Sequence, residues 1–220
     1  DFLAQRTLSP FGAPATAILR ANPDTSEVSF NVNATYAVSD DLNVYARVAR
    51  GYRAPSIQGR LVFGDTLSVA DKETVMSYEA GVKGTLPNAR ARFDAAVFYY
   101  RANDLQITAV GGGANFNRLL NADKAVGYGF EFNAEAEPVD RLILTAGLSY
   151  NNTEIKDPNL FTQPCGGGCT VLDPAGPIAG TVRIDGNSLP NAPKWIANVT
   201  AGYSWPVGEG EIFVFTDWAY

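Results

Sequence analysis

The chain has 220 residues, a formal net charge of −6 and no histidine. The missing histidine excludes Ser-His catalysis and imidazole metal ligation, and the acidic balance argues against a cationic face for nucleic acid. No run of eighteen apolar residues is present, which excludes a helical membrane span. A membrane β-barrel stays open, because its strands alternate lipid-facing and lumen-facing residues and therefore average to a neutral hydropathy.

Hydrophobic alternation with a period of two starts at residue 28. Between residues 28 and 38, valine, phenylalanine and tyrosine fall on one face and serine, asparagine and threonine on the other, which predicts a strand with one apolar face. Residues 1–26 are expected to form an external loop, and residues 28–220 to form strands and loops. The same alternation predicts an all-β, antiparallel chain of eight long strands without a helix, at residues 28–38, 42–53, 75–84, 90–110, 116–137, 141–156, 193–204 and 211–220.

Short and long connections alternate between these strands. The turns near residues 39–41, 86–88, 138–140 and 205–210 are short, whereas residues 54–72, 111–115 and 157–191 form a long, a medium and a very long connection. Strict alternation places all the short turns at one end of the sheet. This layout is typical of outer-membrane barrels, which have short periplasmic turns and longer extracellular loops. The pattern therefore predicts a transmembrane β-barrel in the bacterial outer membrane.

Aromatic residues recur at two heights on the predicted apolar face. About nine residues from a short turn correspond to a climb of about 20 Å in a strand tilted near 45°. Rings at this height are expected to form an outer aromatic girdle, and rings near the turns an inner one. The predicted outer girdle contains Phe30, Tyr99, Tyr128, Tyr150, Trp195 and Trp218, and the inner girdle contains Tyr36, Phe93 and Tyr203. The alternative is a soluble sheet whose buried face contains these rings.

The only two cysteines, Cys165 and Cys169, are separated by three glycines in the longest connection. A pair at this spacing can contribute to a metal site, but the chain has no further soft ligand, so no metal is expected. We predict a disulfide between them in an oxidising compartment. Two free thiols in a loop are the alternative.

The predicted strands are longer than a membrane crossing requires. Residues 90–110 and 116–137 each exceed the nine to eleven residues that span a bilayer as a tilted strand, which is typical of large barrels. The polar face is rich in glycine, serine, asparagine and alanine, which are too small to fill the narrow lumen of an eight-stranded barrel. The chain also lacks a plausible first strand, and its last strand has no partner. The long strands, the small residues of the polar face and these two features favour a segment of a larger barrel. A small eight-stranded barrel is the alternative.

Several segments resemble the barrel of TonB-dependent outer-membrane receptors. "DDLNVYARVARGYRAPSIQGR" (40–60) is similar to a strand of that family that ends in Gly-Tyr-Arg-x-Pro, and "KETVMSYEAGVKG" (72–84) is similar to the strand that follows. "FYYRANDLQI" (98–107) and "NADKAVGYGFEFNAEAEP" (121–138) resemble the next two strands, and "GNSLPNAPKW" (186–195) resembles the element that re-enters the barrel. The resemblance covers about residues 28–220 in the family's order.

This resemblance implies the C-terminal part of a twenty-two-stranded barrel, whose N-terminal plug engages TonB. The chain departs from the pattern because it contains neither a plug nor a TonB box and is expected to stop a few strands early. The implied function is TonB-driven uptake of a scarce solute, such as a siderophore or saccharide, without catalysis and without a cofactor. The implied partners are the small-molecule ligand, TonB through the plug, and outer-membrane lipid and lipopolysaccharide.

Ligand contact is predicted where the polar strand face meets an external loop. Arginines there would grip anionic groups of a metal chelate in a bidentate manner. The candidate residues are Arg50, Tyr52, Arg53, Gln58, Arg60, Asn115 and Asn117. For each residue, loop structure or lipopolysaccharide contact is the alternative role. A passive porin or a structural barrel is the alternative function for the chain as a whole.

Overall fold

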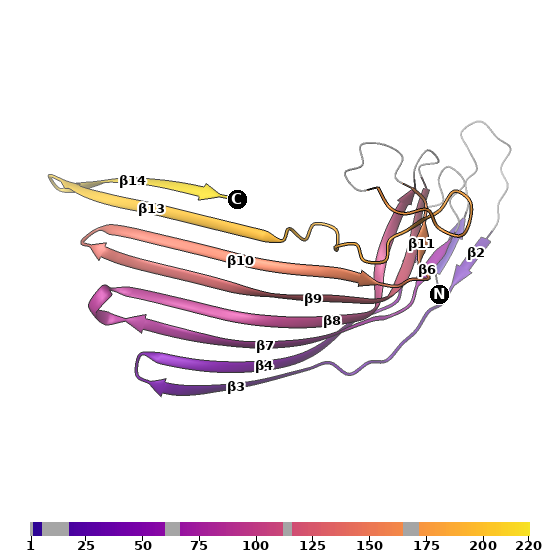
Figure 1. Cartoon of the computed structure of the whole chain (residues 1–220), viewed down its shortest axis with the longest axis horizontal. Helices are drawn as coiled ribbons and strands as arrows, with labels where there is room; N and C mark the ends of the chain where they lie inside the picture. Colours follow the sequence, from indigo (N-terminus) through magenta and orange to yellow (C-terminus); the bar gives the residue numbers. More distant parts are fainter. Residues whose placement is uncertain (1, 6–17, 60–66, 112–115, 165–171) are drawn as a thin grey trace.

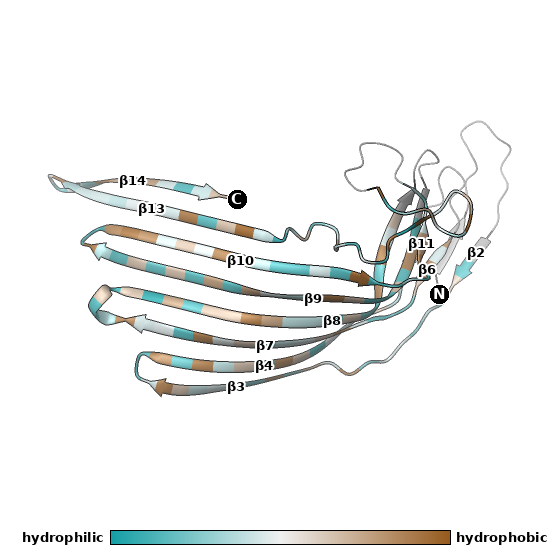
Figure 2. Cartoon of the chain, viewed as in Figure 1, coloured by the Kyte–Doolittle hydropathy of each residue, from teal (hydrophilic) through white to brown (hydrophobic). Residues whose placement is uncertain are grey.

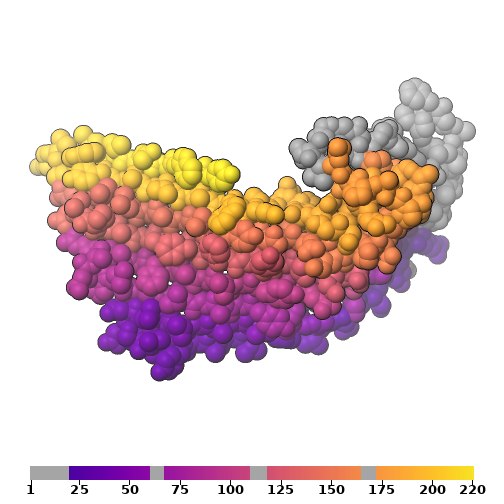
Figure 3. Space-filling view, in the orientation of Figure 1, coloured from indigo at the N-terminus to yellow at the C-terminus, as the bar shows by residue number. Residues whose placement is uncertain are grey.

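A computed structural model describes residues 2–5, 18–59, 67–111, 116–164 and 172–220. Its main feature is one curved, antiparallel sheet of eight strands in the order β14-β13-β10-β9-β8-β7-β4-β3, which follows the chain without a crossover (Figure 1). The space-filling view shows the same strands packed side by side in sequence order (Figure 3). The eight strands are β3 (Phe30–Ser39), β4 (Leu42–Arg53), β7 (Glu73–Leu86), β8 (Ala91–Gly111), β9 (Phe116–Val139), β10 (Leu142–Lys156), β13 (Trp195–Val207) and β14 (Gly210–Ala219).

The all-β prediction is confirmed, and each predicted strand corresponds to one of these eight. The sheet is open within the described residues, because β3 and β14 each have only one neighbour. The helical content of the described residues is one 3-10 turn (η1) at Pro87–Ala89, between β7 and β8. Proline at the start of such a turn has its φ angle already fixed, and Arg90 closes the turn in the left-handed region. No helix in the described part of the chain has the length and apolarity needed to span a membrane.

Alternating side chains give the sheet two distinct faces. Tyr78 of β7, Tyr99 of β8 and Tyr128 of β9 lie opposite one another in the ladder and share one face. We call this the apolar face; the neighbouring residues along each strand form the polar face. Figure 2 shows hydrophobic and hydrophilic bands alternating along the strands. Large side chains of the apolar face are exposed rather than buried, for example Val97 at 59% and Tyr128 at 48%. An apolar surface of this extent requires an apolar environment.

All four tight turns lie at one end of the sheet, the left end in Figure 1. They join β3 to β4, β7 to β8, β9 to β10, and β13 to β14. The longer connections leave the opposite end, which we call the loop end; the other is the turn end. The predicted sorting of connections is therefore present in the fold.

Two of the predicted long loops contain short strands. Residues 54–72 include the hairpin of β5 (Ser56–Gln58) and β6 (Ser68–Ala70), and β11 (Phe161–Thr162) pairs with β12 (Val182–Arg183) in the longest connection. Before β3, β1 (Phe2–Gln5) pairs with β2 (Ile18–Ala21). The few buried apolar residues of the described chain lie toward the loop end, where the β5–β6 hairpin packs against β9. They are Ala70, Ala102, Ala122, Ala125 and Ile155.

Candidate functional site

The middle of the polar face carries a network of hydrogen-bonded charges. The Tyr45 hydroxyl on β4 donates a 2.6 Å hydrogen bond to the Glu79 carboxylate on β7. Arg47 approaches the same carboxylate at 4.0 Å and donates to Asn31 Oδ1 on β3 at 3.2 Å. Lys83 lies 5.8 Å from the centre of the Tyr45 ring. These contacts bind three neighbouring strands through side chains that face the polar side.

A second group of polar contacts lies toward the turn end of the same face. Arg92 on β8 pairs with Glu135 on β9 at 2.8 Å, and Asn133 donates to Asp94 at 3.1 Å. These side chains line an open hollow of about 470 Å³ that also reaches the turn at Asp41. Because both pairs are partly exposed, each contributes little to stability and keeps its polar atoms available to a partner.

Aromatic rings on the polar face occupy the space over glycines of the next strand. A Cβ at Gly129 would stand 2.8 Å from the Phe98 ring and would also collide with the Tyr150 carbonyl oxygen of β10. A Cβ at Gly127 would collide with the Tyr100 ring. Glycine at these positions gives the rings the room to cover the backbone. Phe98 and Tyr100 form the wall of a second hollow of about 450 Å³, which Glu131 also lines.

The 54–72 connection is attached to the β8–β9 hairpin by two amide side chains at the loop end. Buried Gln106 donates from Nε2 to the carbonyls of Ala54 and Asp71 at 2.8 and 2.9 Å, and its Oε1 accepts a 2.6 Å bond from the Ser56 hydroxyl. Asn121 bonds both the amide and the carbonyl of Asp71, at 2.7 and 3.0 Å. These bonds hold the described part of the connection close to the loop end of the polar face.

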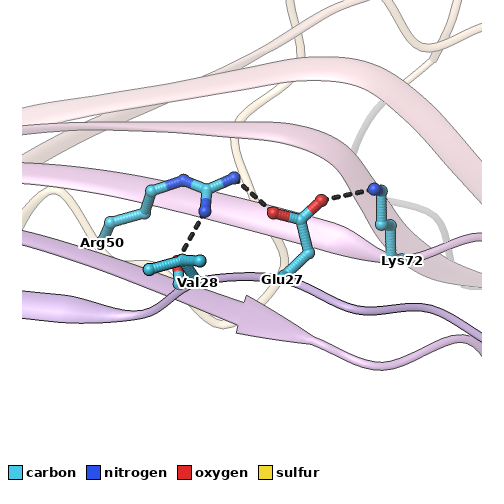
Figure 4. A network of polar contacts seen from close by, with 4 residues as sticks. All are labelled: Glu27, Val28, Arg50 and Lys72. Atoms are coloured by element: carbon cyan, nitrogen blue, oxygen red, sulfur yellow. Dashed lines mark hydrogen bonds and ion pairs between the residues drawn. The ribbon is translucent and has the colours of Figure 1, made fainter.

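A carboxylate clamp attaches the segment before β3 to the neighbouring strands. The Glu27 carboxylate binds Arg50 of β4 at 2.6 Å and also Lys72, while Arg50 donates to the Val28 carbonyl at 2.5 Å (Figure 4). The hydrogen bonds from Lys72 and then Arg50 lower the pKa of Glu27 below its ordinary value of 4.5. Glu27 thus fixes residues 22–29 beside the loop end of β4.

The strand β4 separates the predicted ligand residues onto different faces. Arg50 and Tyr52 lie on the apolar side, since Arg50 is in register with Phe30 and Tyr52 is two residues farther on. Arg53 lies on the opposite, polar side and is exposed. The Arg50 guanidinium is occupied by the Glu27 clamp. Of these three residues, Arg53 is therefore the one placed toward the polar face.

The other predicted ligand residues lie in the connections. Gln58 ends β5 and pairs with Ser68 of β6, and the backbone of Asn117 pairs with Val110 in the β8–β9 ladder. Arg60, Asn115, Cys165 and Cys169 fall outside the described residues. Ligand contact by these residues and the predicted disulfide therefore remain predictions.

All nine predicted girdle residues lie on the apolar face. Tyr99 is opposite Tyr128 in the ladder, and Tyr150 is opposite Trp195 with ring centres 4.7 Å apart. Their contact with the membrane interface remains a prediction, which this common face and register support.

Sequence reasoning missed the Glu27 clamp and the Gln106 and Asn121 contacts. No local pattern marks them, because the partners are 22 to 52 residues apart.

A family model described as "TonB dependent receptor-like, beta-barrel" matches residues 7–220. The chain belongs to this family. The fold is accordingly a transmembrane β-barrel of the bacterial outer membrane, and the family consists of receptors rather than enzymes. The apolar face is then the lipid-facing side, the polar face lines the lumen, and the loop end is extracellular.

The related proteins are much longer than this chain. The pesticin receptor of Yersinia pestis is 30% identical over 127 residues, which are 58% of this chain and 17% of that protein. The solved ferric yersiniabactin uptake receptor FyuA from Yersinia pestis aligns with a TM-score of 0.61 at 21% identity, over 92% of this chain and 27% of that one. The siderophore receptor PiuA from Acinetobacter baumannii aligns with a TM-score of 0.56 at 18% identity, over 89% and 26%. At these identities the two structures establish the fold alone.

Proposed function

We propose that this chain supplies lumen wall and external loops to a receptor that takes up a scarce small molecule across the outer membrane, driven by TonB through a plug domain. The observation that carries the proposal is the match to the receptor barrel family over residues 7–220. The fold supports it, because a polar, hydrogen-bonded face leads from the turn end to a loop end where residues 54–59 and 67–72 are attached by Gln106 and Asn121.

A metal-chelating siderophore is the ligand class that we favour, with a saccharide as the alternative. Two of the similar solved proteins are a ferric yersiniabactin uptake receptor and a siderophore receptor. Arg53 adds support from this chain, because an exposed guanidinium on the lumen side near the loop end suits an anionic chelate. The remaining predicted contacts are Tyr52, Gln58, Arg60, Asn115 and Asn117, while Arg50 serves the Glu27 clamp.

The experiment uses the full-length receptor that contains this chain, expressed in cells with and without TonB. Ferric siderophores and labelled oligosaccharides are tested for binding to whole cells and for accumulation inside them. We expect one ligand to bind in both strains and to accumulate only in the strain with TonB. Equal accumulation in both strains would instead identify a passive porin.

A charge-matched pair of variants tests the site. Arg53→Gln is expected to weaken ligand binding about tenfold, the effect of losing one charge-assisted contact of about 1.5 kcal/mol. Arg141→Gln is the control, because Arg141 is an exposed arginine at the turn end. If both variants bind as the unmodified receptor does, Arg53 is not a ligand contact, and the TonB requirement still tests the function.

A further inference from the structure

Three cations lie next to one another on the lipid-facing side of β8, β9 and β10, beyond the predicted outer girdle in the direction of the loop end. Arg101 shares its face with Tyr99, Lys124 with Tyr128, and Lys156 lies directly opposite Lys124 in the β9–β10 ladder. Lys124 is also opposite Asn103, which is two residues from Arg101, so Arg101 and Lys124 are diagonal neighbours. We call Arg101, Lys124 and Lys156 the cation cluster.

The described residues of the chain provide fewer paired carboxylates than the cation cluster has positive charges. Lys156 pairs with Glu154 at 3.2 Å, and Arg101 donates to the oxygen of the neutral Asn103 amide at 2.8 Å. Within the described residues, neither Arg101 nor Lys124 forms an ion pair. Like charges directly opposite one another in a ladder are destabilising. The Lys124–Lys156 repulsion is offset only in part by Glu154, which is a diagonal neighbour of Lys124, because one carboxylate serves three cations.

The neighbouring strands show how the chain neutralises cations when it does so internally. Arg50 also lies on the lipid-facing side near the loop end, and the Glu27 carboxylate binds both Arg50 and Lys72 (Figure 4). At the cation cluster, Glu154 shares the lipid-facing side and pairs with Lys156, so among the described residues one carboxylate serves three cations, whereas Glu27 serves two. The difference indicates that part of the counter-charge of the cation cluster comes from the surroundings.

The height of the cluster identifies those surroundings. Arg101 is two residues and Lys124 four residues beyond the girdle tyrosines Tyr99 and Tyr128, about 7 and 13 Å along the strands toward the extracellular end. Aromatic girdles mark the edge of the hydrocarbon layer, so the cluster stands at the level of the headgroups of the outer leaflet. Phosphate groups are the strong anions at that level, and clustered lysine and arginine at a membrane surface attract anionic headgroups.

We propose that Arg101, Lys124 and Lys156 form a binding site for the phosphate groups of an outer-leaflet glycolipid, the lipid A part of lipopolysaccharide. This proposal locates the expected lipopolysaccharide contact on three residues. It rests on the family membership and on the side assigned to each face. It does not depend on which solute is transported.

The test uses the full-length receptor, purified in detergent and stripped of lipid. Binding of lipid A with its phosphates, and of lipid A with both phosphates removed, is titrated against the receptor. The site variant carries Arg101→Gln, Lys124→Gln and Lys156→Gln. The control carries Arg90→Gln and Arg141→Gln, two exposed arginines at the turn end of the sheet. At about fivefold per basic residue, we expect the site variant to bind phosphorylated lipid A about 100-fold more weakly, with the control unchanged.

A thermal measurement separates lipid binding from a folding defect. In lipid-free detergent, Lys124→Gln removes the repulsion with Lys156, so its unfolding temperature should equal or exceed that of the unmodified receptor. Adding phosphorylated lipid A should raise the unfolding temperature of the unmodified receptor more than that of the variant. Equal affinity of both lipids for the unmodified receptor, or full affinity of the site variant, would overturn the proposal. Solute uptake is read separately, so failure here leaves the proposed function standing.

Discussion

On β9, Phe130 and Phe132 lie on one side of the sheet, whereas Gly127, Gly129 and Glu131 lie on the other. The two sides of the same strand therefore require different surroundings. The lipid-facing side consists of large side chains whose exposed surface needs an apolar solvent. The lumen side consists of small residues covered by rings from the next strand, and of charges that need partners.

The difference shows which property each face depends on. On the lipid-facing side the requirement is chemical, because any large apolar residue satisfies the hydrocarbon and a charge does not. On the lumen side the requirement at several positions is steric, because aromatic rings occupy the space in which a Cβ would stand. Substitutions at neighbouring positions should therefore differ in cost according to the face that they reach.

The largest difference is expected between residues 96 and 97 of β8. Val97 is on the lipid-facing side between the two girdles, and Ala96 is on the lumen side opposite Gly81 and Glu131. Val97→Arg should destabilise the receptor by about 2–4 kcal/mol, the cost of an arginine near the bilayer midplane. Ala96→Arg, beside the Glu131 carboxylate, should cost clearly less. Urea unfolding of the full-length receptor in lipid vesicles measures both, and equal costs would contradict the assignment of the faces.

A smaller effect is expected from adding one methyl group on the lumen side. Gly129→Ala places a Cβ against the Tyr150 carbonyl and the Phe98 ring, and should cost about 1–3 kcal/mol, as overpacking does. Gly51→Ala on the same face is the control, because nothing lies within 4 Å of its Cβ position. Removing a glycine from a strand interior should stabilise the control by about 0.5 kcal/mol. If Gly129→Ala and Gly51→Ala unfold at the same denaturant concentration, the steric requirement at Gly129 is contradicted.

The smallest effect is local and concerns the Glu27 clamp. Because Lys72 and Arg50 lower the pKa of Glu27, the clamp stabilises residues 22–29 fully above the unfolded pKa of about 4.5 and loses this contribution as the pH falls through the lower folded value. Hydrogen-exchange protection of residues 22–29 should therefore be constant from pH 7 to about pH 5 and decrease in more acidic solution.

Glu27→Gln is the matched variant for this measurement. Without the carboxylate, the protection of residues 22–29 should already be reduced at pH 7 and should not decrease further with acid. A segment that exchanges equally in both proteins at pH 7 would show that the clamp contributes nothing. The eight-stranded sheet should keep its protection in both proteins, since Glu27 lies outside it.

The sequence by itself determined the strands, their faces and the end to which each connection belongs. Residues 42–53 were predicted with the bounds that β4 has in the structure, because alternation with a period of two is a local property of consecutive side chains. The family resemblance rested on motifs such as residues 72–84, which are also local.

The tertiary structure alone decided which distant residues meet. It gave Arg50 a carboxylate partner, attached residues 54 and 71 to β8 through Gln106, and put Lys124 opposite Lys156. Each of these depends on the register between strands, which hydrogen bonds set across the ladder and which a single strand does not encode. The periodicity of the chain thus produced the two faces, and the pairing of the strands produced the contacts on them.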